Sequence, residues 1–451
     1  MHPTGANKSL PQSSPFESAA LKAVFSKINW RLIPLLLIAY MVAYLDRINV
    51  GYAQLQMKQT LPFDDAVYGL GAGIFFIGYF LFEVPSNLLL EKIGARKTLL
   101  RIMVLWGLAA TAMMFVSTPL QFYVVRFLLG AFEAGFFPGV ILYFTYWYPS
   151  VRRGQVIAIF MSATTIMSVI AGPLCGAILK YFDGISGLHG WQWLFLVQGL
   201  PAIVVGFLVY LLLEDKPAHA AWLSRDEKKL IDDSFQHDVK DVESEPAGTF
   251  GQALRDPKVY VLSFVYFLLL GATYTLVFWL PTLIQSWGVK DLFLIGIYAA
   301  IPNAAGVIGM ILIGRHSDKW HERRWHFAGC VAIAAVGLFV TTLLQGNLVG
   351  SILALSFAVI GIASATPLFF ALVSEYLSVG AAAGGIALIS CLGNLGPAVS
   401  PTINGFILRN TGDNIYSMYF VLALYLLSGT LLLLTIRPAS TAGVPAAAPA
   451  H

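Results

Sequence analysis

Four charged residues lie within apolar stretches long enough to cross a membrane, and they are the residues best suited to chemistry. Asp46 and Arg47 are adjacent within 30–54, and Arg126 and Glu133 both lie within 119–147. Each such charge costs about 2.5–3.5 kcal/mol at the centre of a bilayer, so we expect none to face lipid. Two helical turns separate Arg126 from Glu133, which places both on one helix face. This pattern indicates a polar pathway inside a bundle of membrane helices.

The charges of this group suggest what it does. Two arginines and two carboxylates sum to zero, and arginine stays charged whereas a carboxylate can take up a proton. Protonating Asp46 or Glu133 gives the group a positive charge that binds an organic anion, and the bound anion favours retention of the proton. The pattern therefore predicts proton–anion symport, with the order of titration left open. A structural network that only joins two helices is the alternative.

The composition is that of an integral membrane protein. Of 451 residues, 57% are hydrophobic and only 12% are charged, with a mean hydropathy of +0.73, whereas soluble domains contain about 25% charged residues. Cys175, Cys330 and Cys391 lie in apolar segments without paired spacing, so we expect no disulfide, metal or cofactor. The first 28 residues lack the apolar core of a cleavable signal, so the first helix is expected to be retained.

Twelve apolar spans divide the chain into two halves. The predicted fold is an all-α membrane protein with a six-helix bundle over 29–213 and another over 258–437. A polar segment, 214–257, links them, and residues 1–28 and 438–451 form the tails. In the linker, Ser224 and Glu227 give a capping-box signal for a surface helix, whose aliphatic face either rests on the membrane or is part of a solvated linker. The spans are 30–54, 67–90, 98–117, 119–147, 154–181, 191–213, 258–285, 293–315, 325–344, 349–376, 380–408 and 415–436.

The two halves repeat each other. Landmarks recur at nearly one offset: Glu91 and Asp318 after the second helix of each half, Gly172 and Gly396 in the fifth, and Tyr148 and Tyr376 at the end of the fourth. A duplicated six-helix unit predicts two parallel bundles around a central cavity.

Basic residues predict the orientation. With the N-terminus inside, 22 of the 28 Lys and Arg residues fall in inside segments and only four in outside loops. The positive-inside rule therefore predicts that both termini are cytoplasmic. The net charge of +4 is then a topology signal, and no nucleic-acid partner is expected.

Several segments resemble known transporters. The loops NLLLEKIGARK (Asn87–Lys97) and GRHSDKWHERR (Gly314–Arg324) resemble the signature loop of the major facilitator superfamily, although the first has Asn87 and Glu91 where Gly and Asp are usual. Four further segments resemble the anion:cation symporter family: YLDRINVGYA, GYFLFEVPSN, RFLLGAFEAGFFPG and GWQWLFLVQGLPA. Within that family they are most similar to bacterial permeases for tartrate, phthalate, hydroxyphenylacetate and sugar acids. The resemblance implies an alternating-access transporter in the cell (inner) membrane, and we expect it to act as a monomer.

The resemblance also implies roles for the four charges. The helix 1 arginine of the family, here Arg47, contacts the substrate carboxylate, and the acids at Asp46 and Glu133 are implicated in proton coupling. Arg126 matches a family arginine with a gating or coupling role. Two arginines in the cavity suit a mono- or dicarboxylate, so we expect Arg126 to assist substrate binding.

Uncharged and peripheral residues complete the predicted site. Tyr79, Tyr274 and Asn394 are candidate substrate partners. For Tyr274 the sequence favours ordinary packing or an interfacial belt, and helix–helix bonding explains Asn394 equally well. Four further residues at cytoplasmic helix ends are expected to form ion pairs that lock the inward gate: Glu91, Arg96, Asp318 and Arg324. Retention of topology by positive charge is the alternative for this set.

These features predict a secondary transporter and not an enzyme, because no phosphate-binding loop or nucleophile–base set is present in the sequence. The expected activity is proton-coupled import of a small carboxylate across the bilayer. A tartrate-like hydroxy acid or sugar acid is the first expectation and an aromatic carboxylate the second. A proton-independent exchanger or uniporter is an alternative, and so is a membrane receptor or sensor of organic acids.

Overall fold

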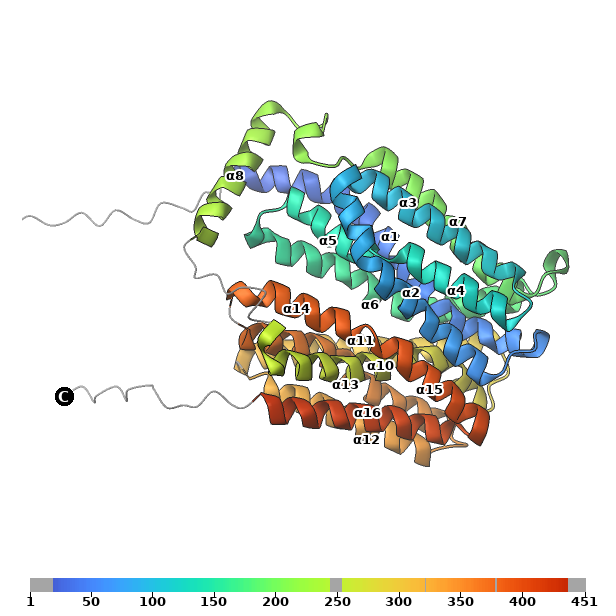
Figure 1. The fold of residues 1–451 in the computed structure, drawn as a ribbon. Helices are drawn as coiled ribbons and strands as arrows, with labels where there is room; N and C mark the ends of the chain where they lie inside the picture. Colours follow the sequence, from blue (N-terminus) through green and yellow to red (C-terminus); the bar gives the residue numbers. More distant parts are fainter. Residues whose placement is uncertain (1–18, 244–253, 321, 378, 437–451) are drawn as a thin grey trace, which may run out of the picture.

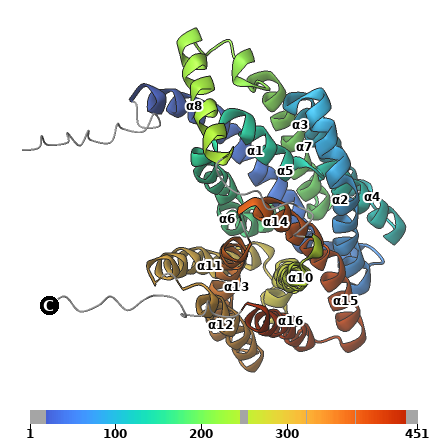
Figure 2. The same cartoon turned by 60° about the vertical axis from the view of Figure 1, so that its left-hand side comes forward.

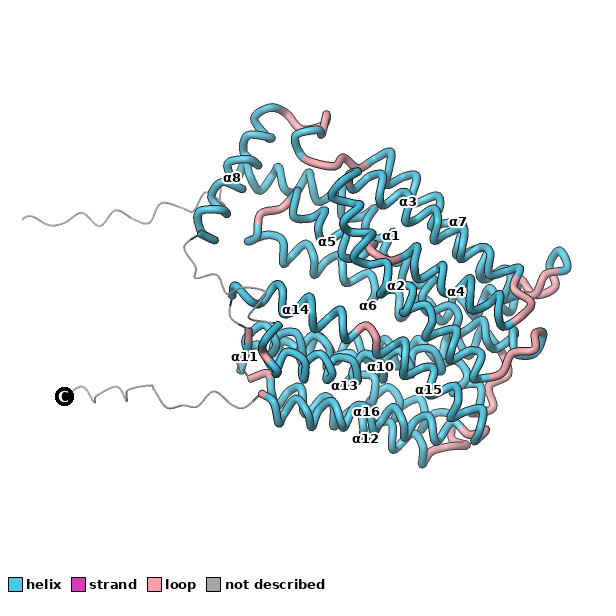
Figure 3. Tube along the Cα trace, in the orientation of Figure 1, coloured by secondary structure: helices cyan, strands magenta, loops and turns pink. Residues whose placement is uncertain are grey.

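A computed structural model of the chain describes residues 19–243, 254–320, 322–377 and 379–436. The described residues form helices joined by short loops and contain no strand (Figures 1 and 3). Twelve helical stretches within these ranges are long and apolar enough to cross a membrane. The predicted all-α fold with twelve spans is therefore confirmed.

The helices fall into two groups of six spans, which Figure 2 shows as separate clusters. The first half contains α1 (Ala19–Thr60), α2 (Asp65–Ile93), α3 (Ala95–Ala112), α4 (Pro119–Glu133), α5 (Phe136–Trp147), α6 (Ser150–Tyr181) and α7 (Gly190–Leu212). The linker contributes α8 (Arg225–Glu243). The second half contains α10 (Pro257–Ser286), α11 (Leu292–Trp320), α12 (Arg324–Leu343), α13 (Leu348–Tyr376), α14 (Val379–Gly393), α15 (Gly396–Thr411) and α16 (Asn414–Thr435).

Two of the predicted spans, 119–147 and 380–408, lie in stretches long and apolar enough to cross a membrane, but each is divided by a short turn. This corrects the expectation of one continuous helix for the first. The first break falls at Ala134 and Gly135, directly after Glu133, and the second at Asn394 and Leu395 (Figure 3). Gly135 has φ +87°, a left-handed conformation that glycine adopts without steric cost. A Cβ at Gly135 would lie 2.5 Å from Ser86 Oγ, so close packing also requires glycine there.

The chain before the first predicted span is helical as well. α1 begins at Ala19, within the segment assigned to the N-terminal tail, because Leu21, Val24, Phe25 and Ile28 form a buried face. The predicted capping box forms: Glu227 N donates to Ser224 Oγ at 3.1 Å, and Ser224 N donates to a Glu227 carboxylate oxygen at 2.7 Å.

The aliphatic residues of the linker helix pack on the protein. Leu223 and Ile231 are buried in the main core, and Leu230 is partly buried against it. Lys27 of α1 pairs with Glu227 of α8 at 2.9 Å. The described start of the linker therefore docks onto the extension of α1 through these residues.

The internal repeat is visible in matching hydrogen bonds. Tyr148 Oη donates to Asn29 at 2.9 Å, and Tyr376 Oη donates to Asp256 at 3.0 Å in the second half. In the same way, Arg96 donates to the Tyr210 carbonyl in α7, and Arg324 donates to the Leu433 carbonyl in α16. Equivalent residues thus make equivalent contacts in the two bundles.

The halves meet at one end of the molecule. We call the end where the halves meet the far end, and the ribbons of the two halves converge toward it (Figure 1). The opposite end, which we call the near end, contains the start of α1, helix α8 and the last turn of α16. Close backbone approaches join α2 to α15 and α6 to α11 at the far end, and α1 packs on α10. A Cβ at Gly296 would lie 2.1 Å from the Gly172 carbonyl oxygen, and one at Gly69 2.5 Å from the Pro401 carbonyl oxygen. Glycine is what permits this contact.

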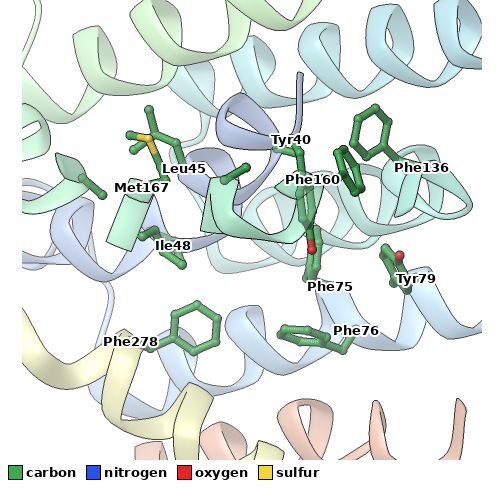
Figure 4. Packing of buried hydrophobic residues seen from close by; sticks show 14 of the residues in the cluster. Tyr40, Leu45, Ile48, Phe75, Phe76, Tyr79, Phe136, Phe160, Met167 and Phe278 are labelled. Atoms are coloured by element: carbon green, nitrogen blue, oxygen red, sulfur yellow. The ribbon is translucent and has the colours of Figure 1, made fainter. Parts of the chain in front are cut away.

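Aromatic side chains fill the interior around the centre of the first half. Tyr40 of α1 stacks on Phe160 of α6 with ring centroids 4.5 Å apart (Figure 4). Phe76 of α2 meets Tyr274 of α10 edge-on, with ring centroids 4.9 Å apart. Four of the twelve spans therefore meet at the depth where the charged residues lie.

Candidate substrate and proton site

Arg47 and Glu133 form an ion pair at the centre of the first half. An Arg47 Nη2 hydrogen bond reaches Glu133 Oε1, and Glu133 is the last residue of α4, directly before the helix break. The Glu133 side chain is 1% exposed, whereas that of Arg47 is 15% exposed. Arg47 is therefore the member of the pair that open space can reach.

Arg47 also connects the two halves. Its Nη1 donates to Tyr274 Oη of α10 at 3.3 Å. Tyr274 follows Arg47 by 227 residues, so it occupies the equivalent position of the second repeat. Arg47 Nε and Glu133 Oε2 have no hydrogen-bond partner among the described residues, so the pair retains one donor and one acceptor for further contacts.

Aromatic rings of α2 surround the guanidinium of Arg47. Its centre lies 5.3 Å from the Tyr79 ring centroid and 5.6 Å from that of Phe75, within the range of cation–π attraction. Figure 4 shows Phe75, Phe76 and Tyr79 along one stretch of α2. The rings hold the arginine without neutralising it, which leaves its charge available to an anion.

Asp46 turns away from Arg47 into the first bundle. Trp106 of α3 donates its Nε1–H to Asp46 Oδ2, and Asn49 donates to Oδ1 at 3.0 Å. Asp46 is 1% exposed. Asp46 therefore lies behind the Arg47–Glu133 pair, and its carboxylate is bonded within its own half.

Sequence reasoning missed both partners of Asp46. Asn49 lies three residues later on the same helix face, which is a signal that the sequence does contain. A buried tryptophan Nε1–H also needs an acceptor, but nothing in the sequence connects Trp106 with Asp46.

Arg126 is enclosed by α2. Its Nε donates to the Gly71 carbonyl at 3.1 Å, and its guanidinium lies 4.8 Å from the Phe75 ring centroid. The residue is 1% exposed, and its Nη2 has no partner among the described residues. Phe75 thus lies against both arginines. In this conformation Arg126 is fully buried against α2, whereas the Arg47 side chain is partly exposed.

The other candidate residues, Tyr79 and Asn394, differ in burial and in position. Tyr79 is buried beside Arg47, whereas Asn394 is half-buried at the break between α14 and α15. Its backbone N–H bonds to the Ser390 carbonyl at 2.9 Å. Two of the predicted uncharged partners, Tyr79 and Tyr274, therefore contact Arg47 directly, and Asn394 lies in the second half at a helix break.

The contacts of three predicted gate residues, Arg96, Asp318 and Arg324, stay within their own half or the adjoining start of the linker. Arg96 pairs with Glu214 at 2.9 Å, and Asp318 pairs with Arg323 at 3.3 Å. Arg324 donates to the Leu433 carbonyl at 2.8 Å, and Glu91 is exposed at the end of α2. These residues lie toward the near end, where the ribbons of the two halves diverge (Figure 1).

Sequence comparisons agree with this architecture. Residues 36–401 match the model of the Major Facilitator Superfamily. A Pseudomonas putida protein named as the metabolite transport protein NicT is 45% identical, covering 87% of this chain and 90% of that protein. An Agrobacterium vitis protein named as a tartrate transporter is 42% identical, covering 93% of this chain and 96% of that protein.

Comparison with solved structures gives the same fold. The crystal structure of a D-xylose–proton symporter matches with a TM-score of 0.72 at 13% identity, covering 90% of this chain and 98% of that one. Identity at this level supports the fold alone.

Proposed function

This chain belongs to the major facilitator superfamily and is a membrane transporter of small organic molecules rather than an enzyme; from that premise we propose that it imports an organic anion by proton symport. The observation that carries the proposal is the Arg47–Glu133 ion pair, which is partly open and bonded to Tyr274 of the other half. Arg47 is the proposed carboxylate ligand, and Glu133 is the proton carrier that competes for it.

The pair couples the two cargoes through its charge balance. A proton on Glu133 removes its charge and frees Arg47 for a substrate carboxylate. If substrate binds without the proton, its carboxylate and that of Glu133 share the single positive charge of Arg47. If the proton binds without substrate, Arg47 is left without an anionic partner. Removing one partner from a buried pair costs about 3–5 kcal/mol. The states with both cargoes bound or both absent are therefore favoured, which is the condition for symport.

Asp46 and Arg126 have supporting parts in this proposal. Asp46 is the second protonatable group, placed behind Arg47 and held by Trp106 and Asn49. Arg126 contributes positive charge from the other side of Phe75 and becomes a substrate ligand if the bundle rearranges around bound anion. Together they keep the whole group neutral when neither cargo is present.

The substrate class follows from the groups beside Arg47. The hydroxyls of Tyr79 and Tyr274 suit a hydroxylated acid, and Asn394 offers an amide from the second half. A tartrate-like hydroxy acid or sugar acid is our first proposal, in line with the name of the Agrobacterium vitis relative. An aromatic carboxylate is the second, because rings of α2 line the same place.

The distribution of basic residues supports cytoplasmic termini in an inner membrane. With that orientation the near end faces the cytoplasm, and the contacts between the halves described above lie toward the outside. The transporter then alternates by separating the far-end contacts and closing the near end.

Uptake into liposomes tests the proposal. We expect the reconstituted protein to accumulate labelled tartrate when the lumen is more alkaline than the medium. Glu133→Gln should abolish accumulation but retain counterflow, because glutamine mimics the protonated acid. Asp232→Asn, on the exposed face of α8, is the matched control.

The outcomes separate the alternatives. Wild-type uptake that ignores the pH gradient identifies an exchanger or uniporter. Binding without counterflow identifies a sensor. Intact gradient-driven accumulation by Glu133→Gln rejects the role given to that residue.

A further inference from the structure

Two ion pairs join the halves at the far end. Arg409 of α15 pairs with Asp64 at 3.2 Å, and Lys180 of α6 pairs with Asp291. Each pair links a residue of the first half with one of the second. Their side chains are between 33% and 56% exposed, so the pairs lie at the rim of the contact.

The two pairs are copies of each other in the internal repeat. Asp64 caps the N-terminus of α2, accepting from Val67 N at 2.8 Å, and Asp291 accepts from Phe293 N at 2.9 Å at the start of α11. Lys180 and Arg409 lie in the last turns of α6 and α15. In both cases a helix-capping aspartate meets a basic residue at a helix C-terminus. Both charges are favourable at those helix ends on their own, and pairing them connects the halves.

A small cavity lies where α10 of the second half meets α1 and α2 of the first, and residues of these three helices line it. Gln54, Tyr68 and Trp279 belong to this lining. Three of their polar atoms, Gln54 Oε1, Tyr68 Oη and Trp279 Nε1, are buried and have no hydrogen-bond partner among the described residues. All three side chains are at most 4% exposed.

Burying polar groups without protein partners opposes closure of the far end. Gln54 still donates to the Phe278 carbonyl at 2.7 Å, but its oxygen is unpaired. A buried polar atom without a partner carries its full desolvation penalty. When the far end opens, bulk water reaches all three groups, so these residues favour the open state.

We propose that the far end is a balanced gate, in which the two symmetric ion pairs hold the halves together and the unpaired polar groups of Gln54, Tyr68 and Trp279 favour reopening. Neither set contacts the Arg47 site. Because the two sets act in opposite directions, the far end can close behind the substrate, and the closed state is not too stable to open again. The gate depends only on the exchange of conformations typical of this family, and does not depend on which anion is carried.

Removing the ion pairs and removing an unpaired polar group should change the ratio of open to closed far-end populations in opposite directions. Spin labels at Gln59→Cys and Ser286→Cys, exposed positions at the far ends of α1 and α10, report the separation of the halves. The full-length protein in nanodiscs, with Cys175, Cys330 and Cys391 replaced by alanine, provides the background. Lys180→Gln combined with Arg409→Gln should raise the ratio of open to closed populations at least about threefold. These substitutions leave both aspartate caps in place.

Tyr68→Phe should lower the same ratio about threefold, since it removes a hydroxyl that is unpaired only in the closed state. Tyr419→Phe, on the exposed face of α16, is the matched control and should leave the ratio unchanged. Asp64→Asn with Asp291→Asn should reproduce the effect of the two glutamine substitutions.

An unchanged ratio in both ion-pair variants overturns the proposal, and so does a Tyr68→Phe shift toward the open state. Thermal unfolding identifies any variant that loses its fold, in which case the other ion-pair variant decides. Because the labels report the gate itself, failure here leaves the proposed symport standing, and failure of tartrate uptake leaves the gate standing.

Discussion

At the scale of single residues, Arg47 is the side chain on which the proposed transport depends most. It contacts Glu133 and Tyr274 at once, which requires the planar fork of a guanidinium. Lysine carries the same charge on a single nitrogen and cannot reproduce both contacts. We therefore expect Arg47→Lys to raise the KM for tartrate uptake at least about tenfold, equivalent to about 1.4 kcal/mol.

Initial uptake rates over a range of tartrate concentrations measure this effect. Arg225→Lys at the start of the surface helix α8 is the control and should behave as wild type. An unchanged KM in Arg47→Lys means that charge alone suffices and that the fork is irrelevant.

The contact between Asp46 and Trp106 should stabilise the first bundle. Both residues are fully buried, and Trp106→Phe leaves a carboxylate oxygen without its donor. We expect a loss of about 2–4 kcal/mol of unfolding free energy, combining the unpaired acceptor with lost volume. A double-mutant cycle with Asp46→Asn, followed by thermal unfolding in detergent, isolates the pairwise part. Strict additivity would show that the two side chains act independently.

These residues show which side-chain directions could be predicted from the sequence and which contacts could not. The adjacency of Asp46 and Arg47 predicts that they point in different directions, and they do. The helical spacing of Arg126 and Glu133 predicts one shared face, but not that Phe75 lies against both arginines. Contacts with α2 and α3 depend on how helices pack, which a linear pattern does not contain.

At the scale of helices, close glycine contacts control how the far end shuts. Gly296 of α11 meets the backbone of Gly172 of α6 so closely that a Cβ would lie 2.1 Å from its oxygen. Gly296→Ala should therefore hold the far end partly open and reduce uptake at least about tenfold, because backbone atoms cannot move aside as side chains do.

Uptake and the far-end spin-label distance together test the role of Gly296. Gly329→Ala in α12 provides the matched control, since nothing lies within 4 Å of its added Cβ. Normal uptake by Gly296→Ala would mean that α6 and α11 shift apart without cost.

The helix breaks mark what the sequence could not predict at this scale. Hydropathy places 119–147 as one span, and the break inside it changes neither its length nor its apolar character. Gly135 is the residue that permits the break, yet most glycines of this chain lie within unbroken helices. The break at Gly135 depends on packing against Ser86 of α2, a tertiary contact.

At the scale of the molecule, the repeat was the most predictable feature and its asymmetry the most informative. Equivalent tyrosines and arginines bond alike in both halves, as their positions in the repeat suggested. The charged group has no such counterpart: Tyr274 stands where the first half has Arg47. The first half thus carries the proposed proton chemistry. Which end of the molecule is closed depends on contacts between the halves, which no single-span pattern reveals.

The two locations of carboxylates, in the interior and at the far-end rim, predict different responses to pH. At the rim, the hydrogen bond from Lys180 holds the pKa of Asp291 below its usual range, and backbone N–H groups at the start of α11 act in the same direction. A lowered folded-state pKa means that the pair is fully present above the ordinary aspartate value, about 3.9, and is lost only as pH falls through the lowered one. The rim pair should therefore stay intact between about pH 5.5 and 7.5.

Proton coupling must then come from the interior acids and not from the rim. In a Glu133→Gln, Asp46→Asn background, the far-end distance distribution should be the same at about pH 5.5 and 7.5, whereas wild-type uptake should rise on acidification. Spin-label distances and uptake at both pH values check this difference. If the far end instead opened on acidification in that background, a rim carboxylate such as Asp291 would be the proton sensor. The driving force would then act on the gate itself, and the Arg47–Glu133 pair would select the anion without coupling it to protons.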